Sequence, residues 1–197
     1  MTRGEERADA ILDATLRLLA RGGYRALTLD AVAAEAHASK ATIYRRWPGK
    51  PALVKSALDA HDVAFTTAVA DTGSLRGDLL SVVDGLRRKT LVFPITLYAE
   101  FVQLMEEDSE LADALRRHLD DDELSPFREP LARAVARGEA RGDVDHRLVH
   151  DVAEAMVVHR LQLGHRLDEA FATRLVDQVL LVLVDPVKTQ RAHPAGP

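Results

Sequence analysis

The stretch HASKATIYRRWPGK, residues 37–50, combines many hydrogen-bond donors with a single apolar edge. Ile43 and Trp47 are four residues apart, so on a helix they share one face and can pack against a core. The lysine, threonine, tyrosine and arginine side chains between Ser39 and Lys50 then project elsewhere. A short helix of this kind fits the major groove of DNA, where its donors meet base edges. Charge alone favours the solvated basic face of a surface helix, so the surrounding sequence has to decide.

The residues before this stretch predict two more helices. Apolar residues recur with helical spacing over about 5–21, and Gly22-Gly23 then ends that helix. Thr28 is a good N-cap for a second, short helix. A third helix follows Ser39, and it is too short and too polar to be stable alone, so the first two must hold it. Two short helices joined by a tight turn behind a longer one form a helix-turn-helix unit.

The remainder of the chain also shows helical spacing, with no convincing β alternation and no internal repeat. We predict an all-α fold of about nine helices, in which a larger helical regulatory and dimerisation domain follows the N-terminal helix-turn-helix. The predicted boundaries are 1–50 for the DNA-binding domain, 51–185 for the second domain and 186–197 for a disordered tail. Beyond residue 50 we expect helices over about 51–70, 79–91, 95–105, 109–119, 126–141, 146–166 and 168–184.

Composition excludes several classes of protein. The 197 residues include no cysteine, which removes disulfides, thiolate metal sites and cysteine nucleophiles. The net charge is −5, yet residues 1–50 carry nine Lys and Arg against six Asp and Glu, which suggests a local anion-facing surface. The acidic opening segment and the short apolar runs favour a soluble cytoplasmic protein. Without a phosphate-cradling glycine loop, a nucleophile elbow or a histidine–glutamate zinc motif, we expect no enzyme.

The segment LTLDAVAAEAHASKATIYRRWPGKPAL, residues 27–53, resembles the amino-terminal domain of TetR-family transcriptional regulators. The hydroxyl cap, the small helix, the Ser-Lys-x-Thr-Ile-Tyr run and the following aromatic residue and lysine carry this resemblance. It covers roughly the first 55 residues, while the all-helical remainder agrees less specifically. The resemblance favours a DNA-binding helix over the solvated-helix interpretation. It implies a sequence-specific, dimeric regulator, and most often a ligand-responsive repressor of a palindromic operator.

The resemblance also implies how individual residues meet DNA. The two capping hydroxyls lie near phosphates, the first turn of the third helix faces the groove, and the tyrosine and final lysine contact the backbone. Which of the two arginines reads bases is left open. The implied DNA-binding residues are Thr28, Ser39, Lys40, Ala41, Thr42, Tyr44, Arg45, Arg46 and Lys50.

Four positions depart from the usual family pattern. His37 stands where the turn between the helices generally has glycine, and histidine is one of the better non-glycine residues for a left-handed conformation. Ala38, Ala41 and Trp47 replace a more usual valine, glycine and phenylalanine. None of these changes removes a phosphate or base contact, so they leave DNA binding in place and affect the operator sequence.

Two further sets of residues are expected in the second domain. Aromatic and sulfur-bearing residues there are either ordinary core or, as the resemblance suggests, the lining of a cavity for a small apolar effector. The last two helices have wide apolar faces, which in the family form a dimer interface. The candidate pocket residues are Phe65, Leu86, Phe93, Tyr98, Phe101, Gln103, Met105 and Phe127. The candidate interface residues are Val152, Met156, His159, Leu163, Leu175 and Val179.

Other readings of the sequence are weaker. His146 and His150 could chelate a metal with a carboxylate, but positions near a helix start explain them better, so we expect no metal and no cofactor. The expected partners are double-stranded operator DNA, a second copy of the chain and a small apolar ligand, without a membrane. Two alternatives are a DNA-binding regulator without a small-molecule effector and a helical enzyme or carrier with a vestigial DNA-binding head.

Overall fold

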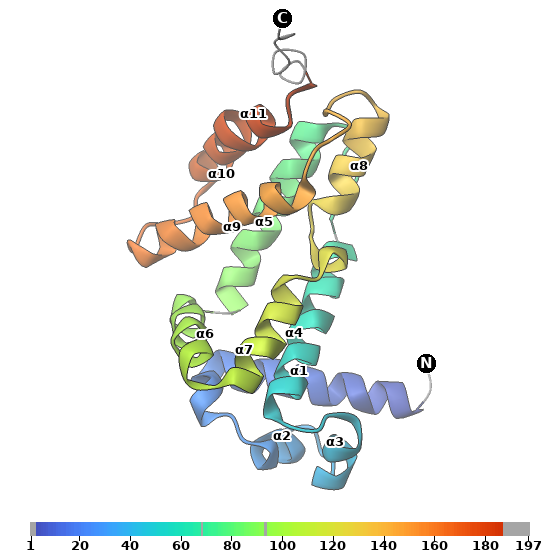
Figure 1. Ribbon diagram of the computed structural model, residues 1–197, viewed down its shortest axis with the longest axis vertical. Coiled ribbons are helices and arrows are strands. Elements are labelled where there is room, and N and C mark those ends of the chain that lie inside the picture. The colour runs from blue at the N-terminus through green and yellow to red at the C-terminus, as the bar shows by residue number, and fades with distance from the viewer. Residues whose placement is uncertain (1–2, 68, 93, 187–197) are drawn as a thin grey trace, which may run out of the picture. The chain divides into compact units, whose positions relative to one another are not determined.

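The computed structural model describes residues 3–67, 69–92 and 94–186, and its secondary structure over these residues is helical throughout (Figure 1). The predicted all-α fold is therefore confirmed. The predicted tail lies, apart from residue 186, outside the described residues. The elements are α1 (Arg3–Ala26), α2 (Leu29–Glu35), α3 (Lys40–Arg46), α4 (Lys50–Thr67), α5 (Leu75–Val92), α6 (Ile95–Glu107), α7 (Ser109–Leu119), η1 (Asp122–Leu124), α8 (Arg128–Ala136), α9 (His146–Gln162), α10 (Glu169–Leu175), η2 (Val176–Leu180) and α11 (Leu181–Val184).

The helix ends differ from the predicted ones where glycine intervenes. α1 extends to Ala26, but Gly23 inside it has φ 74° and ψ −178°, so the helix is broken at the predicted glycine pair. α8 ends at Ala136 instead of about 141, because Gly138 takes a left-handed φ of 75°. α9 ends at Gln162 because Gly164 does the same at φ 73°. α10 continues through a π-helical segment, η2, into α11.

The chain forms two compact units that do not follow the predicted boundary at residue 50. Unit 1 comprises residues 1–64 and 90–124, and unit 2 comprises residues 65–89 and 125–197. Unit 1 therefore contains the helix-turn-helix together with α6 and α7. Sequence spacing gave no sign of this arrangement, because the contacts that join α6 to α1 link residues more than seventy positions apart.

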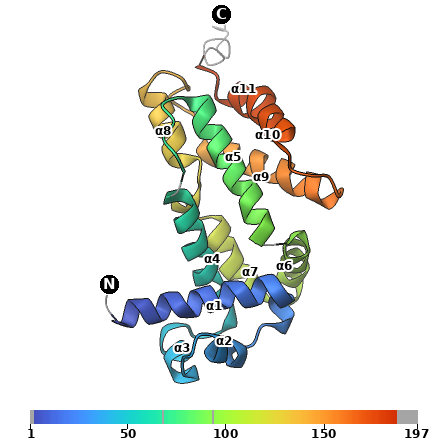
Figure 2. The same ribbon diagram turned by 180° about the vertical axis from the view of Figure 1, so that it is seen from behind.

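The core of unit 1 holds the helix-turn-helix together. In Figure 2, α1 lies alongside α2 and α3, and the apolar faces of these helices meet. Ile43 is fully buried and Trp47 is 6% exposed, as the i, i+4 spacing predicted. Arg17 and Arg21 of α1 both pair with Glu35 of α2, at 3.2 and 2.9 Å. The short α2 and α3 thus gain from packing the stability that they lack alone.

A partly buried cluster of ionisable side chains joins α4 to α7 within unit 1. His118 Nδ1 lies 2.8 Å from an oxygen of Asp59, and its Nε2 lies 3.4 Å from an oxygen of Asp62. Lys55 donates to the other oxygen of Asp59 at 2.6 Å. Burial acts to raise the pKa of Asp59, but the hydrogen bonds and charges of His118 and Lys55 outweigh it and lower that pKa. The helix that follows the helix-turn-helix is therefore fixed to the body of its own unit.

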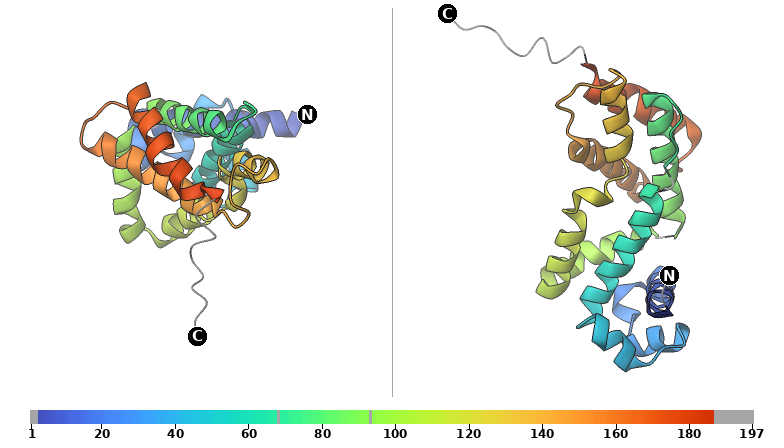
Figure 3. Two further views of the ribbon diagram at one scale, coloured as in Figure 1. Left: turned by 90° about the horizontal axis from the view of Figure 1, so that it is seen from above. Right: turned by 90° about the vertical axis from the view of Figure 1, so that its right-hand side faces the viewer.

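Unit 2 is organised around a second apolar core and a buried carboxylate. Asp78 is fully buried and accepts hydrogen bonds from the backbone and hydroxyl of Thr72, both at 2.7 Å. Arg133 and Arg137 of α8 reach the same carboxylate at 3.3 and 3.4 Å. Figure 3 shows α9 and the α10–α11 stretch, in orange and red, lying against each other.

Candidate nucleic-acid interface

Both predicted capping residues cap their helices. The hydroxyl of Thr28 accepts the backbone N–H of Ala31 at 3.1 Å, and that of Ser39 accepts the backbone N–H of Thr42 at 3.2 Å. The Ser39 and Thr42 hydroxyls also lie 2.9 Å apart. The starts of α2 and α3 are therefore fixed, and Thr28 and Ser39 are both exposed, so that their hydroxyls can face a phosphate.

The turn between α2 and α3 uses a left-handed histidine. His37 has φ 50°, the only positive φ of a non-glycine residue among those described. The Ala38 N–H then donates to the Ala33 carbonyl at 2.9 Å, which closes the end of α2. His37 thus adopts the left-handed conformation for which glycine is usual in this turn, as the sequence indicated.

The outward face of α3 carries the groove-facing candidates. Opposite the buried Ile43, Ala41 and Arg45 are exposed, and Tyr44 beside them is 55% exposed. A small residue at position 41 lets the helix come close to a base pair, since no bulky side chain intervenes. Of the predicted residues of α3, the structure thus leaves Lys40, Ala41, Tyr44, Arg45 and Arg46 exposed, while Thr42 is half-buried.

Two cationic side chains of α3 contact other parts of the protein. Lys40 Nζ lies 2.5 Å from a carboxylate oxygen of Asp30 on α2. Arg46 Nη1 donates to the Gly4 carbonyl at 3.2 Å, and its guanidinium lies 5.9 Å from the Trp47 ring centroid. Neither Asp30 nor Gly4 was expected at this site, because nothing in the local pattern links them to α3.

Lys50 is also less free than the sequence suggested. Its Nζ lies 4.0 Å from the centre of the Tyr24 ring, a cation–π contact in which the lysine is half-buried. Burial lowers the pKa of Lys50, while the charges of Glu100 and Asp108 act in the opposite direction. Lys50 therefore helps to join α4 to the end of α1, in addition to any contact that it makes with DNA.

Known proteins match this chain over both units. Residues 11–57 match the family model described as bacterial regulatory proteins, tetR family, and residues 69–179 match the model of a tetracyclin repressor-like C-terminal domain. A DNA-binding transcriptional repressor TetR of Mycobacteroides abscessus is 57% identical over 186 residues, which cover 94% of this chain and 98% of that protein. The chain belongs to the TetR family of transcriptional regulators.

Two further TetR-family comparisons agree. An uncharacterised HTH-type transcriptional regulator of Mycobacterium bovis is 34% identical over 176 residues, covering 89% of this chain and 86% of its own. The crystal structure of the TetR-family transcription regulator SCO0332 shares 34% identity and aligns with a TM-score of 0.71, over 92% of this chain and all of that one. The chain is accordingly a DNA-binding transcriptional regulator, and α2 and α3 form its helix-turn-helix. Within the described residues, no helix is long and apolar enough to cross a membrane, and no cluster of potential metal ligands is found.

The residues predicted to line a pocket are divided between the two cores of this TetR-family chain. Those in unit 2 are tightly packed: Phe127 is fully buried, and Phe65 lies so close to Gly85 that any side chain there would overlap its ring. Gln103 is exposed and donates to Glu107 at 3.2 Å, and Phe93 lies outside the described residues. The other members are Leu86 in the unit 2 core and Tyr98, Phe101 and Met105, which pack against the unit 1 core.

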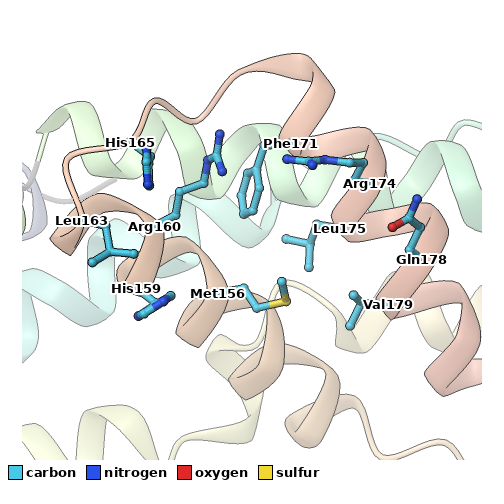
Figure 4. Close-up of a pocket in the computed structure, with 10 residues that line it drawn as sticks. All are labelled: Met156, His159, Arg160, Leu163, His165, Phe171, Arg174, Leu175, Gln178 and Val179. Atoms are coloured by element: carbon cyan, nitrogen blue, oxygen red, sulfur yellow. The ribbon is translucent and has the colours of Figure 1, made fainter.

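Five of the six predicted interface residues line one groove between α9 and the α10–η2 stretch (Figure 4). Val152 lies outside this groove and is half-buried. The groove-lining members are Met156, His159, Leu163, Leu175 and Val179. Sequence reasoning missed Phe171 and Arg160, which face each other there with the guanidinium 4.6 Å from the ring centroid.

Proposed function

We propose that this chain is a homodimeric repressor that binds a palindromic operator and acts by occupying DNA, without catalysis. Bacterial DNA lies in the cytoplasm, so we place its action there. The observation that carries the proposal is α3: its core-facing edge is buried, its start is capped by Ser39, and its opposite face, with Tyr44 and Arg45, is open to solvent. A helix held in this way can enter a major groove without losing its own packing.

The apolar surface of α9 supports the dimer. Leu148, Met156 and Leu163 are 49%, 37% and 59% exposed, and their spacing places them on one face of α9 and its C-cap. Val182 at the end of the chain's last helical stretch is 42% exposed. A stripe of this kind is more than a monomer comfortably exposes, and a second copy of the same stripe would cover it symmetrically.

A small apolar effector is the second part of the proposal. α4 begins at Lys50, directly after the recognition motif, and its last residues belong to unit 2. A ligand that binds one conformer of the body better than another would shift the population through α4 and so change the spacing of the two α3 helices. If operator binding does not respond to any ligand, the regulator without an effector is the better account.

Selection from a random duplex library by the purified full-length protein tests operator recognition. The expected product is an inverted repeat whose half-site centres lie about 10 base pairs, or a multiple, apart. Enrichment of no sequence, or of a single unrepeated half-site, would contradict the proposal.

Matched variants then assign the contacts. Tyr44→Phe removes only a hydroxyl that can reach a phosphate, so affinity should fall by a similar factor on all sequences. Lys50→Met keeps much of the apolar stem over Tyr24 while removing the charge, and it should also reduce the salt dependence of binding. Unchanged affinity in both variants would show that these residues do not contact DNA. Adding candidate apolar ligands to the selected complex tests the effector.

A further inference from the structure

We propose that Arg45 is the arginine that reads a base, that the base is guanine, and that Arg46 is a positioning residue that joins α3 to the first turn of α1. This assignment rests on the sequence-specific DNA binding proposed above and specifies which side chain provides part of the specificity.

The first argument is the geometry of α3. Successive residues of an α-helix are rotated by about 100°, so Ala41 and Arg45 lie about 160° from Ile43, on either side of the line opposite it. Ile43 is fully buried, so this line points away from the core and toward any groove that the helix enters. Arg46 lies only about 60° from Ile43, at the edge of the packed face.

The second argument is the set of contacts that the cations make. At one edge of α3, Lys40 is paired with Asp30, and at the other edge Arg46 donates to the Gly4 carbonyl. Over the part of the chain that the structure describes, the guanidinium of Arg45 makes no hydrogen bond or ion pair, and the residue is exposed. The two flanking cations are therefore held by the protein, and the central one is available.

The third argument is the chemistry of the side chain. A guanidinium can donate two parallel hydrogen bonds to O6 and N7 of guanine in the major groove, the commonest specific contact that arginine makes there. Ala41, one turn before Arg45 on the same face, has only a methyl group and does not hold the helix away from the base pair. Arg45 can therefore reach the floor of the groove.

Arg46 has a different task. Its hydrogen bond to Gly4 spans 42 residues of sequence and fixes the first turn of α1 beside the end of α3. Its guanidinium also lies over the edge of the core at Trp47. Its loss should therefore change how firmly α3 is held, and hence affinity for every sequence, without changing which bases are preferred.

Selection from a random duplex library with the full-length wild type and R45A, R45K, R46A and R46K tests the assignment. In the wild type one position of each half-site should be guanine. In R45A the preference for guanine over the other bases at that position should fall by about 5- to 150-fold, while the base preferences at the other operator positions stay unchanged. R45K should retain part of the preference for guanine. R46A should weaken binding to all sequences by about two- to tenfold, and R46K, which can still donate to the Gly4 carbonyl, should restore part of the affinity.

A substituted operator checks the same contact from the DNA side. Replacing the selected guanine by 7-deazaguanine removes N7, so wild-type affinity should fall while that of R45A stays unchanged. The assignment is overturned if R46A, and not R45A, erases the preference at one position, or if R45A lowers affinity equally on all sequences. If the wild type selects no sequence, sequence-specific binding itself fails; if it does select one and R45A selects the same, only this assignment fails.

Discussion

The carboxylate of Glu100 on α6 occupies the space that a side chain on Gly23 would need. Glu100 accepts the backbone N–H groups of Tyr24 and Arg25 at 2.9 and 2.8 Å, and a β-carbon on Gly23 would overlap its Oε2. Gly23 also has φ 74° and ψ −178°, a conformation that is open almost only to glycine. The end of α1 is therefore joined to α6 by a contact that depends on both residues.

Glu100→Ala should lower the free energy of unfolding by about 1–3 kcal/mol, because the N–H of the buried Tyr24 loses its acceptor. Glu100→Gln keeps one carbonyl oxygen as an acceptor, so it should lower the free energy of unfolding by less than Glu100→Ala does. Gly23→Ala should be at least as harmful as Glu100→Ala, since it adds backbone strain to the overlap. Urea unfolding measures all three, and a fully stable Gly23→Ala would contradict the account of this contact.

His37 stores some strain in the turn before the recognition helix. His37→Gly should raise the free energy of unfolding by up to about 1 kcal/mol, since glycine takes a positive φ without the steric cost, partly offset by its freer unfolded chain. Ala36→Gly is the matched control: Ala36 has φ −88°, so glycine there should only destabilise. Thermal unfolding of both variants provides the comparison, and a destabilised His37→Gly would show that the histidine side chain stabilises the turn.

Asp78 should make unit 2 sensitive to acid. Burial alone would raise its pKa, but hydrogen bonds from Thr72 and Arg133 and the charge of Arg133 lower it below the ordinary 3.8. Because the folded pKa is the lower one, the carboxylate stabilises the protein above the ordinary pKa, and this contribution is lost as the pH falls through the folded value. Asp78→Asn should lower the free energy of unfolding by about 2 kcal/mol near neutral pH. It should also reduce the further decrease of that free energy at low pH, which urea unfolding between about pH 6 and pH 3 measures. An equally steep acid loss in the variant would contradict the assignment.

The groove between α9 and the last helical stretch should be where two copies meet. The double variant Met156→Glu/Leu163→Glu places two charges on the exposed apolar face of α9. The dimer should therefore dissociate, and operator affinity should fall as a result. Leu119→Glu is the control, because Leu119 is 54% exposed on α7 and is not one of the residues that line the groove. Light scattering after size-exclusion chromatography reports the mass. A monomeric wild type, or a double variant that stays dimeric, would refute this interface.

Local sequence predicted those features that local chemistry determines. Ser39 and Thr28 could be recognised as caps because an N-cap hydroxyl acts on a backbone N–H only three residues away. Ile43 and Trp47 could be assigned to the core from their spacing, whereas His37 stood out only because the family that the chain resembles generally has glycine there.

Contacts between distant residues could not be predicted in this way. The Arg46–Gly4 hydrogen bond and the Glu100–Tyr24 contact join residues 42 and 76 positions apart, with no local signal at either end. For the same reason the division into two discontinuous units was missed, and the shortened α8 depended on a backbone angle at Gly138. The predicted pocket residues share a chemical character, yet they are divided between two cores, because apolar character does not specify which core a residue joins.

Competition binding tests the central claim, sequence-specific recognition by α3, most directly. The fluorescence anisotropy of a labelled, selected operator is measured with the full-length protein, in the presence of increasing unlabelled operator or random duplex at one fixed salt concentration. The account predicts that the operator is bound at least about 10³-fold more tightly than random DNA. A ratio close to unity, with binding that added salt abolishes, would contradict it, because only non-specific phosphate attraction would then remain.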